Sequence, residues 1–310
     1  MSVFTEVHQH DLADLATHLS LGRIDSLQPV EGGVQNSNYF VHSEAGDWVL
    51  TLFEQMTAAQ AQVYVDLLLT LRARGLPVPQ PRCDAHGQAL FPLRDKPALL
   101  VERSLATSSE SVSLRQRQVL GGLLGRLHVA MRDWSGPAHP RGHGWRQRQL
   151  QQLMPHLTVA DRELVSWAAE VDRRVLAVDL PQGGIHADLF RDNVLWHGEE
   201  LALVLDFYVA GRDRLWLDLA ICQHDWCRDA KGQLDPVAWQ VFLQAYERER
   251  PLQDLERDEQ VQKDMAVVAA LRFFLSRSAA ALAPPQAGVL VKNPQEYRRI
   301  LQVLRSAERL

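Results

Sequence analysis

The sequence of 310 residues is poor in cysteine and has no strong excess of charge of either sign. Its three cysteines, Cys83, Cys222 and Cys227, cannot all pair, and their spacing matches no zinc motif. The net charge is −5 and no long basic block is present, which argues against nucleic acid as the main partner, because nucleic-acid binding depends on neutralising phosphates. We therefore expect buried, reduced thiols and a mixed-charge surface.

Long apolar runs are also scarce. The N-terminus reaches charged residues at once and has no apolar core of signal-peptide length. No later segment reads as long and apolar enough to span a bilayer. The densest basic stretch, residues 141–148, is interrupted by glycines and predicts a solvated loop. Together these features predict a cytoplasmic protein with no membrane partner.

Hydrophobic periodicity divides the chain into two parts. Early in the chain, apolar and polar residues alternate in several short segments, which predicts strands, and two stretches with helical periodicity lie among them, at residues 3–20 and 58–74. Later the pattern is mostly helical, except for short apolar segments between residues 194 and 205. This predicts an α+β fold of two lobes: a small antiparallel sheet with helix at 1–103, and a larger, mainly helical lobe at 104–310.

The strongest motif is a polar loop between two apolar segments. It reads GIHADLFRDNVL at residues 184–195, and VLDF follows at residues 204–207. The pattern His-x-Asp-x-x-x-x-Asn with a later Asp-Phe has the spacing of the protein-kinase catalytic loop and its metal-binding Asp. The chain therefore resembles a kinase of the protein-kinase-like class, and we read His186 as a structural residue that hydrogen-bonds within the loop.

The chemistry of phosphoryl transfer explains these residue types, because the reaction needs mainly positioning and neutralisation of phosphate charge. Asp188 is the predicted catalytic base, since its carboxylate can accept the proton of an attacking hydroxyl. Asn193 and Asp206 offer the hard oxygen ligands that Mg²⁺ prefers. In the simpler alternative, Asp188 and Asn193 only cap a turn, but the Asn and the second Asp together argue against it. ATP and Mg²⁺ are the predicted cofactors.

A second motif, EGGVQNSNYFV at residues 31–41, places a glycine pair between two strands. Such a loop can fold over phosphates through its backbone N–H groups, although a tight hairpin explains the pattern equally well. The residues predicted to bind the nucleotide are those of this loop and of a hinge near residue 102: Gly32, Gly33, Asn36, Ser37, Asn38, Glu102 and Arg103. Thr51 stands where kinase-like strands usually carry a Lys or Arg, so the phosphate charge must be met elsewhere.

Asp218 precedes an apolar segment that predicts a helix. One interpretation is an ordinary acidic residue near a helix start, where the dipole favours negative charge. The other is a residue that anchors the catalytic loop from behind. The sequence leaves both interpretations open.

At these residues the chain resembles the aminoglycoside phosphotransferase and choline kinase superfamily, and within it the bacterial homoserine kinase branch. The likeness runs almost end to end. The catalytic-loop motif is shared by the whole superfamily and implies the type of reaction. Narrower segments imply L-homoserine as the acceptor, in threonine biosynthesis: VLTLFE (49–54), HADLF (186–190), DFY (206–208), DWC (225–227) and ALRFFLSR (270–277). Members of this branch also tend to carry Thr where Thr51 stands.

The acceptor has alternatives. Choline, an aminoglycoside or methylthioribose would keep the enzyme in the same superfamily, whereas a catalytically silent nucleotide-binding module would be a protein of another class. An aminoglycoside pocket should be strongly acidic, but residues 211–277 mix acids with arginines, which suits a zwitterionic amino acid. We expect Arg272 or Arg277 to bind the acceptor carboxylate, Asp225 to meet its ammonium group, and Trp226 to wall the pocket.

Overall fold

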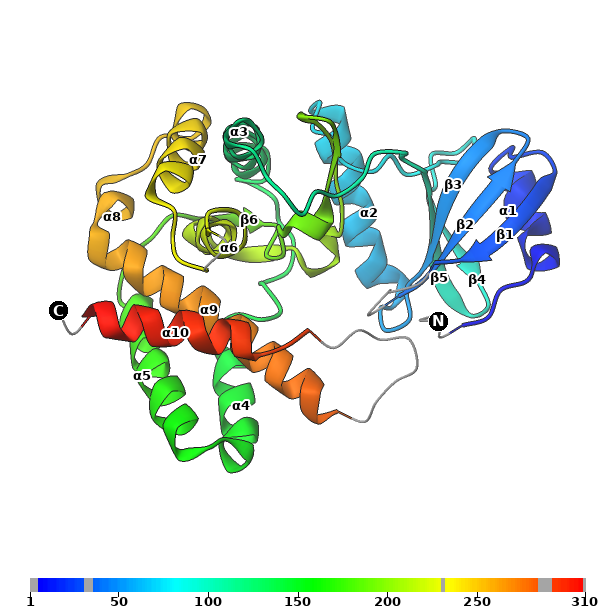
Figure 1. Ribbon diagram of the computed structural model, residues 1–310. Coiled ribbons are helices and arrows are strands. Elements are labelled where there is room, and N and C mark those ends of the chain that lie inside the picture. The colour runs from blue at the N-terminus through cyan, green and yellow to red at the C-terminus, as the bar shows by residue number, and fades with distance from the viewer. Residues whose placement is uncertain (1–4, 31–35, 230–231, 284–291, 309–310) are drawn as a thin grey trace. The chain divides into compact units, whose positions relative to one another are not determined.

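The computed structural model describes residues 5–30, 36–229, 232–283 and 292–308, and Figure 1 labels its helices and strands. The described residues form two compact units. The first unit comes from Met1–Ala106 and Leu203–Tyr208, and the second from Thr107–Ala202, Val209–Ala283 and Val291–Leu310. The short segment that carries Asp206 thus clusters with the first unit. The single boundary expected at residue 103 stays a prediction.

The first unit is built on an antiparallel sheet with the strand order β1-β2-β3-β5-β4. The strands are β1 (Ile24–Pro29), β2 (Ser37–Ser43), β3 (Gly46–Leu52), β4 (Leu90–Leu93) and β5 (Lys96–Glu102). Helix α2 (Ala58–Ala73) begins after Thr57, whose hydroxyl accepts the Gln60 N–H, and it ends just before Gly75, whose φ is +74°. The predicted sheet and the predicted helix at 58–74 are confirmed.

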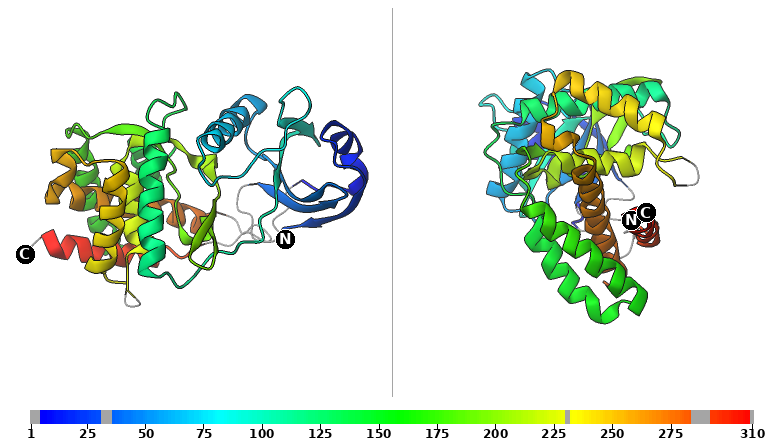
Figure 2. Two further views of the ribbon diagram at one scale, coloured as in Figure 1. Left: turned by 90° about the horizontal axis from the view of Figure 1, so that it is seen from above. Right: turned by 90° about the vertical axis from the view of Figure 1, so that its left-hand side faces the viewer.

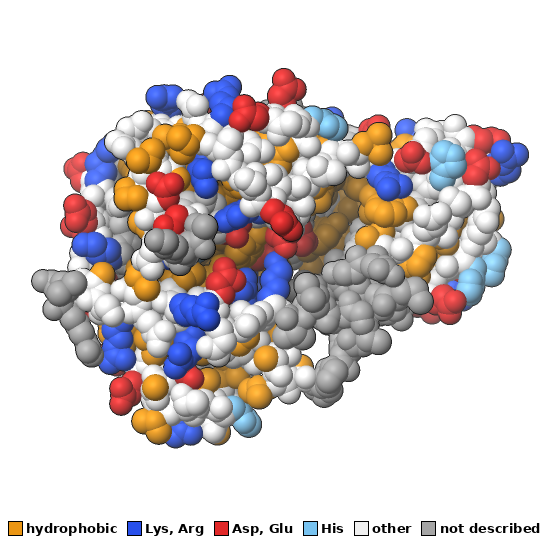
Figure 3. Space-filling model, in the orientation of Figure 1, with side chains coloured by type: hydrophobic (Ala, Val, Ile, Leu, Met, Phe, Trp, Pro, Cys, Tyr) orange, Lys and Arg blue, Asp and Glu red, His pale blue; other side chains and the backbone are white. Residues whose placement is uncertain are grey.

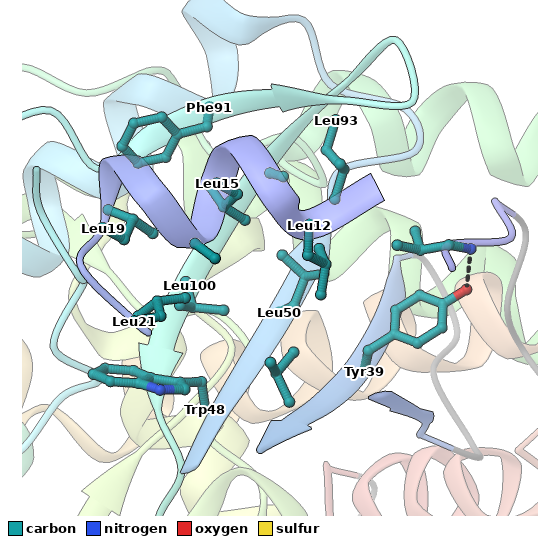
Figure 4. Close-up of a cluster of buried hydrophobic side chains, with 14 of the residues drawn as sticks. Leu12, Leu15, Leu19, Leu21, Tyr39, Trp48, Leu50, Phe91, Leu93 and Leu100 are labelled. Carbon is teal, nitrogen blue, oxygen red and sulfur yellow. Dashed lines mark hydrogen bonds between the residues drawn. The ribbon is translucent and has the colours of Figure 1, made fainter. Parts of the chain in front are cut away.

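One face of this sheet carries the core of the first unit (Figure 4). Leu50 of β3 packs there against the N-terminal helical segment, which consists of η1 (Gln9–Leu12) and α1 (Ala13–His18). The helix expected over residues 3–20 is therefore shorter, and Ser20 at φ +52° follows it. Because side chains alternate between the faces of a strand, Thr51 points to the opposite face from Leu50.

The second unit is mainly helical. Its helices are α3 (Leu114–Ala130), α4 (His143–Leu153), η2 (Met154–His156), α5 (Val159–Leu176), η3 (Arg191–Asn193), α6 (Trp216–Trp226), α7 (Pro236–Glu249), α8 (Asp254–Arg257), α9 (Glu259–Leu282) and α10 (Gln295–Glu308). Helices α3 and α7 lie side by side (Figures 1 and 2). Glycines on α3 permit this contact, because a Cβ at Gly121 would lie only 2.2 Å from the carbonyl oxygen of Phe242.

Helix α9 is the centre of the second unit and packs against α4, α5, α6 and α10. By length and composition it meets the criterion for crossing a membrane, with a mean hydropathy of 1.5. The expectation that no segment is so long and apolar was therefore wrong. Because 67% of that window is buried inside the protein, its apolar side chains serve the core of the unit.

Short strands carry the predicted catalytic motif. Strand β6 (Gln182–Ile185) pairs antiparallel with β9 (Gly211–Arg214), and β7 (Val194–His197) pairs with β8 (Glu200–Val204). Asp188 follows β6, and Asp206 follows β8 just before the short helix η4 (Phe207–Val209). The strands predicted between residues 194 and 205 are confirmed.

The basic stretch at residues 141–148 is not a solvated loop, contrary to the sequence analysis. Most of it is the first part of α4, and Arg146 is buried in a two-pronged ion pair with Asp172, with N–O distances of 2.6 and 3.1 Å. The two hydrogen bonds to the Asp172 carboxylate explain why this arginine is tolerated inside the unit, since they offset the cost of burying its charge. On the face drawn in Figure 3, basic and acidic side chains are interspersed.

Packing of α3 against α7 gives a testable expectation. Gly121→Ala should lower the free energy of unfolding by about 1–3 kcal/mol, because the new methyl group would press on the backbone of α7. The matched control is Gly122→Ala, whose Cβ would meet its nearest atom at 3.8 Å. That variant should be neutral, or more stable by up to about 1 kcal/mol through helix propensity. Urea unfolding of both variants measures the difference, and equal effects would contradict the close packing at Gly121.

Candidate active site

A buried carboxylate holds the predicted catalytic loop. Asp218, on α6, accepts the backbone N–H groups of His186 and Ala187, each at 2.7 Å. Its Oδ2 also lies 3.1 Å from Nε2 of His128, and both side chains have no exposed surface. The interpretation of Asp218 as an anchor of the loop is confirmed, because an ordinary acidic residue at a helix start would face solvent.

The surroundings of Asp218 keep it ionised. Burial opposes its charge, but the hydrogen bond and charge of His128 hold the pKa of the Asp218 carboxyl below its usual value. Nδ1 of His128 lies 2.8 Å from the hydroxyl oxygen of Tyr246 on α7. Neither partner could be predicted from the sequence, since helical periodicity does not show which distant side chains meet.

The anchored loop contains a backbone conformation that is rare outside glycine. Ala187 has φ +66°, in the left-handed region, which costs about 1–3 kcal/mol for a residue with a Cβ. The hydrogen bond from its N–H to Asp218 offsets this cost. The turn at Ala187 directs the chain into Asp188, whose side chain is 26% exposed.

Asp188 is oriented by two neighbours. Its own N–H donates to Nδ1 of His186 at 3.2 Å, which confirms the predicted structural role of that histidine. Arg272, on α9, has no exposed side-chain surface, and its Nη1 lies 3.4 Å from Oδ1 of Asp188. Nη2 of Arg272 also donates to the carbonyl oxygen of Ala187 at 3.1 Å. Burial lowers the pKa of Arg272 to about 9, so the guanidinium stays charged at neutral pH.

Asn193 is fixed by the same loop. Its side-chain Nδ2 donates to the carbonyl oxygen of Asp188 at 2.8 Å, and the N–H of Phe190 donates to that oxygen at 2.8 Å as well. Because the amide nitrogen of Asn193 is used in this way, its Oδ1 is the atom that can serve as a metal ligand. The position fits the predicted role of a neutral oxygen donor for Mg²⁺.

Two residues predicted for the acceptor pocket contact the loop from behind. Oδ2 of Asp225 accepts the N–H of Arg191 at 2.8 Å, and the indole N–H of Trp226 donates to the carbonyl oxygen of Leu189 at 2.9 Å. Trp226 has no exposed surface, so here it supports the loop and does not wall an open pocket. An acceptor contact of Asp225, whose side chain is 20% exposed, stays a prediction.

The two candidate arginines on α9 differ in their partners. Arg277 forms an ion pair with Glu296 at 2.6 Å, donates to the carbonyl oxygen of Asn293 at 3.1 Å, and stacks on the ring of Tyr297. Arg272 instead contacts Asp188. Of the pair, Arg272 is thus the one that the structure places beside the predicted catalytic base.

In the first unit, Gly32 and Gly33 lie outside the described residues. Asn36 and Ser37 are buried, and the hydroxyl of Ser37 donates to Oε1 of Glu54 at 2.6 Å. Nζ of Lys96 lies 3.5 Å from the other oxygen of Glu54. The chain therefore carries a lysine near the end of β3, although not at the position of Thr51.

At Thr51, a hydrogen-bonding hydroxyl takes the place of the positive charge that kinase-like strands usually carry there. The Thr51 hydroxyl donates to Oδ1 of Asn38, directly opposite in the sheet, at 2.7 Å. Tyr208 follows nearby in the first unit, and burial followed by the charge of Asp206 raises its pKa. Since its oxygen is engaged, Asn38 presents its amide nitrogen as a donor.

The predicted hinge residues stand at the end of β5. Glu102 is exposed and pairs with Trp48 in the sheet. Arg103 donates its N–H to the carbonyl oxygen of Asp47 at 2.9 Å, and its guanidinium carbon lies 3.7 Å from the ring centroid of Phe40. Their contact with adenine stays a prediction.

Residues 26–252 match the model of the phosphotransferase enzyme family. The chain is 36% identical to the homoserine kinase of Polaromonas naphthalenivorans over 97% of each chain. It is 38% identical to that of Methylobacillus flagellatus, over 97% of this chain and 95% of the relative. With the homoserine kinase of Pseudomonas aeruginosa UCBPP-PA14 it shares 37% identity over 99% of this chain and 98% of the relative.

Solved structures of kinases have the same fold. Spectinomycin phosphotransferase in complex with ADP and spectinomycin superposes with a TM-score of 0.75 at 12% identity, covering 99% of this chain and 100% of that one. Amicoumacin kinase in complex with AMP-PNP and Ca²⁺ gives a TM-score of 0.73 at 16% identity, covering 97% and 94%. The predicted kinase-like fold is confirmed.

Asp225 predicts a pH dependence of stability. Burial raises its pKa to about 6, against about 3.9 in an unfolded chain. Between these values the folded protein holds a proton that the unfolded chain has lost, so stability falls as the pH rises through this window. Asp225→Asn keeps an acceptor for the Arg191 N–H and removes the charge. Relative to wild type, this variant should gain up to about 3 kcal/mol of unfolding free energy between pH 4 and pH 7.

Urea unfolding across that pH range measures the gain. Asp133→Asn, at an exposed position, is the control and should give the same pH profile as wild type. Identical profiles for wild type and Asp225→Asn would contradict the buried, proton-holding carboxyl.

Proposed function

The chain belongs to the phosphotransferase enzyme family, and on this premise we propose that it phosphorylates the hydroxyl of L-homoserine with ATP. The observation that carries the proposal is the relationship to curated homoserine kinases, at 36–38% identity over nearly the full length of both chains. The product would be O-phospho-L-homoserine, which places the enzyme in threonine biosynthesis. The structure supports this reaction through the environment of Asp188.

Asp188 acts as the base in the proposed reaction. Arg272 contacts Oδ1, and no described residue forms a hydrogen bond to Oδ2, so Oδ2 is the oxygen that accepts the proton of the acceptor hydroxyl. As that proton leaves, the acceptor oxygen forms its bond to the γ-phosphorus, and the bond between the γ-phosphorus and the bridging oxygen breaks to release ADP. The anchored loop supplies the positioning that this reaction needs.

Asn193 and Asp206 would hold Mg²⁺, which when bound neutralises charge on the phosphates. The oriented amide of Asn193 and the exposed carboxylate of Asp206 fit that role. The nucleotide would be bound by the residues that the sequence analysis named: Gly32, Gly33, Asn36, Ser37, Asn38, Glu102 and Arg103. The hydrogen bond from Thr51 supports Asn38 in this set, because it turns the amide nitrogen outward; that nitrogen donates one N–H to the carbonyl oxygen of Asn36 at 3.5 Å and has a second N–H for a phosphate oxygen.

The proposed compartment is the cytoplasm. Cys222 and Cys227 are buried and Cys83 is partly exposed, and all three are free thiols. Unpaired cysteines suit a reducing compartment. The small lobe at 1–103 would bind the nucleotide, and residues 104–310 would bind the acceptor.

The acceptor is tested by steady-state kinetics with ATP and Mg²⁺ on the purified protein. The panel consists of L-homoserine, L-serine, choline, methylthioribose and kanamycin. L-homoserine should give the highest kcat/KM. A higher value for choline, methylthioribose or kanamycin would overturn the homoserine assignment and leave the kinase assignment intact. ATP binding without turnover of any acceptor would favour a silent module instead.

The role of Asp188 is tested by Asp188→Asn. Turnover should fall by roughly two to four orders of magnitude, the range for loss of a positioned base. The variant should stay folded and bind ATP, although its unfolding midpoint should fall because the buried Arg272 guanidinium loses its anionic partner. Asp192→Asn is the matched control, since Asp192 lies in the same loop, is exposed, and pairs with Lys292. Wild-type turnover in Asp188→Asn would remove Asp188 from the role of base.

A further inference from the structure

The segment that precedes α4, residues 137–142, is held in place by β9. The N–H of Arg212 donates to the carbonyl oxygen of Pro137 at 2.8 Å, and the N–H of His139 donates to the carbonyl oxygen of Arg212 at 3.0 Å. The two backbones touch, because a Cβ on Gly211 would lie 2.4 Å from Cα of His139. Arg141 therefore extends from a fixed segment.

Two other basic side chains near Arg141, those of His139 and Arg146, have partners inside the protein. Nδ1 of His139 lies 3.1 Å from Oδ2 of Asp213, and burial lowers the pKa of His139, so its imidazole is neutral. Arg146 is bound to Asp172 and also donates to the backbone carbonyl oxygen of Arg141 at 3.1 Å. The Arg141 guanidinium differs from both. It is partly exposed and has no hydrogen bond or ion pair among the residues that the structure describes.

Backbone contacts place Arg141 close to the catalytic loop. His139, two residues before it, packs on Gly211 of β9, and Gly211 pairs with Ile185 at the end of β6, the strand that leads to Asp188. Helix α4, which begins two residues after Arg141, also packs against α9, the helix that carries Arg272.

After burial, the positive charge of Arg141 is the strongest influence that lowers the pKa of Arg272, and Arg272 contacts both Asp188 and the carbonyl oxygen of Ala187. The two guanidinium charges thus oppose each other, and among the described residues only Arg272 has a carboxylate partner. Like charges at close range are unfavourable, and an anion bound at Arg141 would relieve their repulsion. The charge of Arg272 also lowers the pKa of His139. The buried Nε2 of His139 has no hydrogen-bond partner among the described residues.

We propose that Arg141 binds the carboxylate of the acceptor and is the residue that selects an amino acid over other alcohols. The inference rests on the proposed function, because it takes the acceptor to be an amino acid with its hydroxyl at Asp188. The planar fork of arginine matches a carboxylate through two parallel hydrogen bonds. Arg277, the other candidate on α9, is already paired with Glu296.

The test compares L-homoserine with 3-aminopropan-1-ol, which has the same hydroxyl, chain and amine but no carboxylate. Arg141→Gln should lower kcat/KM for L-homoserine roughly 10- to 100-fold, mainly through KM, because a charge-assisted contact is lost. The value for 3-aminopropan-1-ol and the KM for ATP should change by less than about twofold. Arg141→Lys keeps the charge without the fork and should recover part of the loss. Arg148→Gln, exposed on α4 in the same basic stretch, is the matched control and should behave as wild type.

Unchanged kinetics in Arg141→Gln would overturn the inference. So would an equal fall for the two acceptors, which would indicate a general structural role, or a rise in the KM for ATP, which would assign Arg141 to a phosphate. Failure of the proposed function would be detected independently of the variants, from the acceptor preference of the wild-type enzyme. If wild type turned over another alcohol far better than L-homoserine, the homoserine assignment would fail before any variant was compared, and the inference would fail with it.

Discussion

The catalytic loop of this protein depends on one buried carboxylate that accepts two backbone N–H groups. Asp218 binds the amides of His186 and Ala187, and this contact holds Ala187 in the left-handed conformation that turns the chain toward Asp188. The carboxylate is itself held by His128, which reaches Tyr246 on α7. A buried charge with several hydrogen bonds is costly to disturb, because removing one partner leaves the others unsatisfied. The geometry of the predicted base is thus set by side chains buried behind the loop, on α3, α6 and α7.

Positive charge gathers around Asp188 as well. Arg272 is fully buried, yet it stays charged because it contacts both the carboxylate of Asp188 and the carbonyl oxygen of Ala187. Such an arrangement is tolerated because the guanidinium has an anionic partner and stacks on the ring of Phe273, at 3.7 Å from its centroid. A site with cations beside its base suits an acceptor that carries its own negative charge. It suits a polycationic aminoglycoside less well, since that substrate would meet repulsion.

In the first unit, Thr51 stands on β3 where kinase-like strands usually carry a phosphate-binding lysine, and its side chain forms a hydrogen bond in place of that charge. The hydroxyl of Thr51 engages the oxygen of Asn38, so the residue ties β3 to β2. A neutral contact of this kind fixes orientation without supplying charge. The burden of neutralising phosphates would then rest more heavily on Mg²⁺ and on backbone N–H groups.

The sequence by itself determined the order of the elements, the polar loop with Asp188 and Asn193, and the family, because strand alternation, helical periodicity and short motifs are local properties of the chain. It left Asp218 open between two roles, and it placed Arg146 in a solvated loop and Trp226 at a pocket wall. Only the tertiary structure decided these cases. It buries Asp218 under the loop, pairs Arg146 with Asp172, and turns the Trp226 indole to the Leu189 carbonyl. The partners of a buried polar group come from distant parts of the chain, and no periodicity in the sequence records which of them meet.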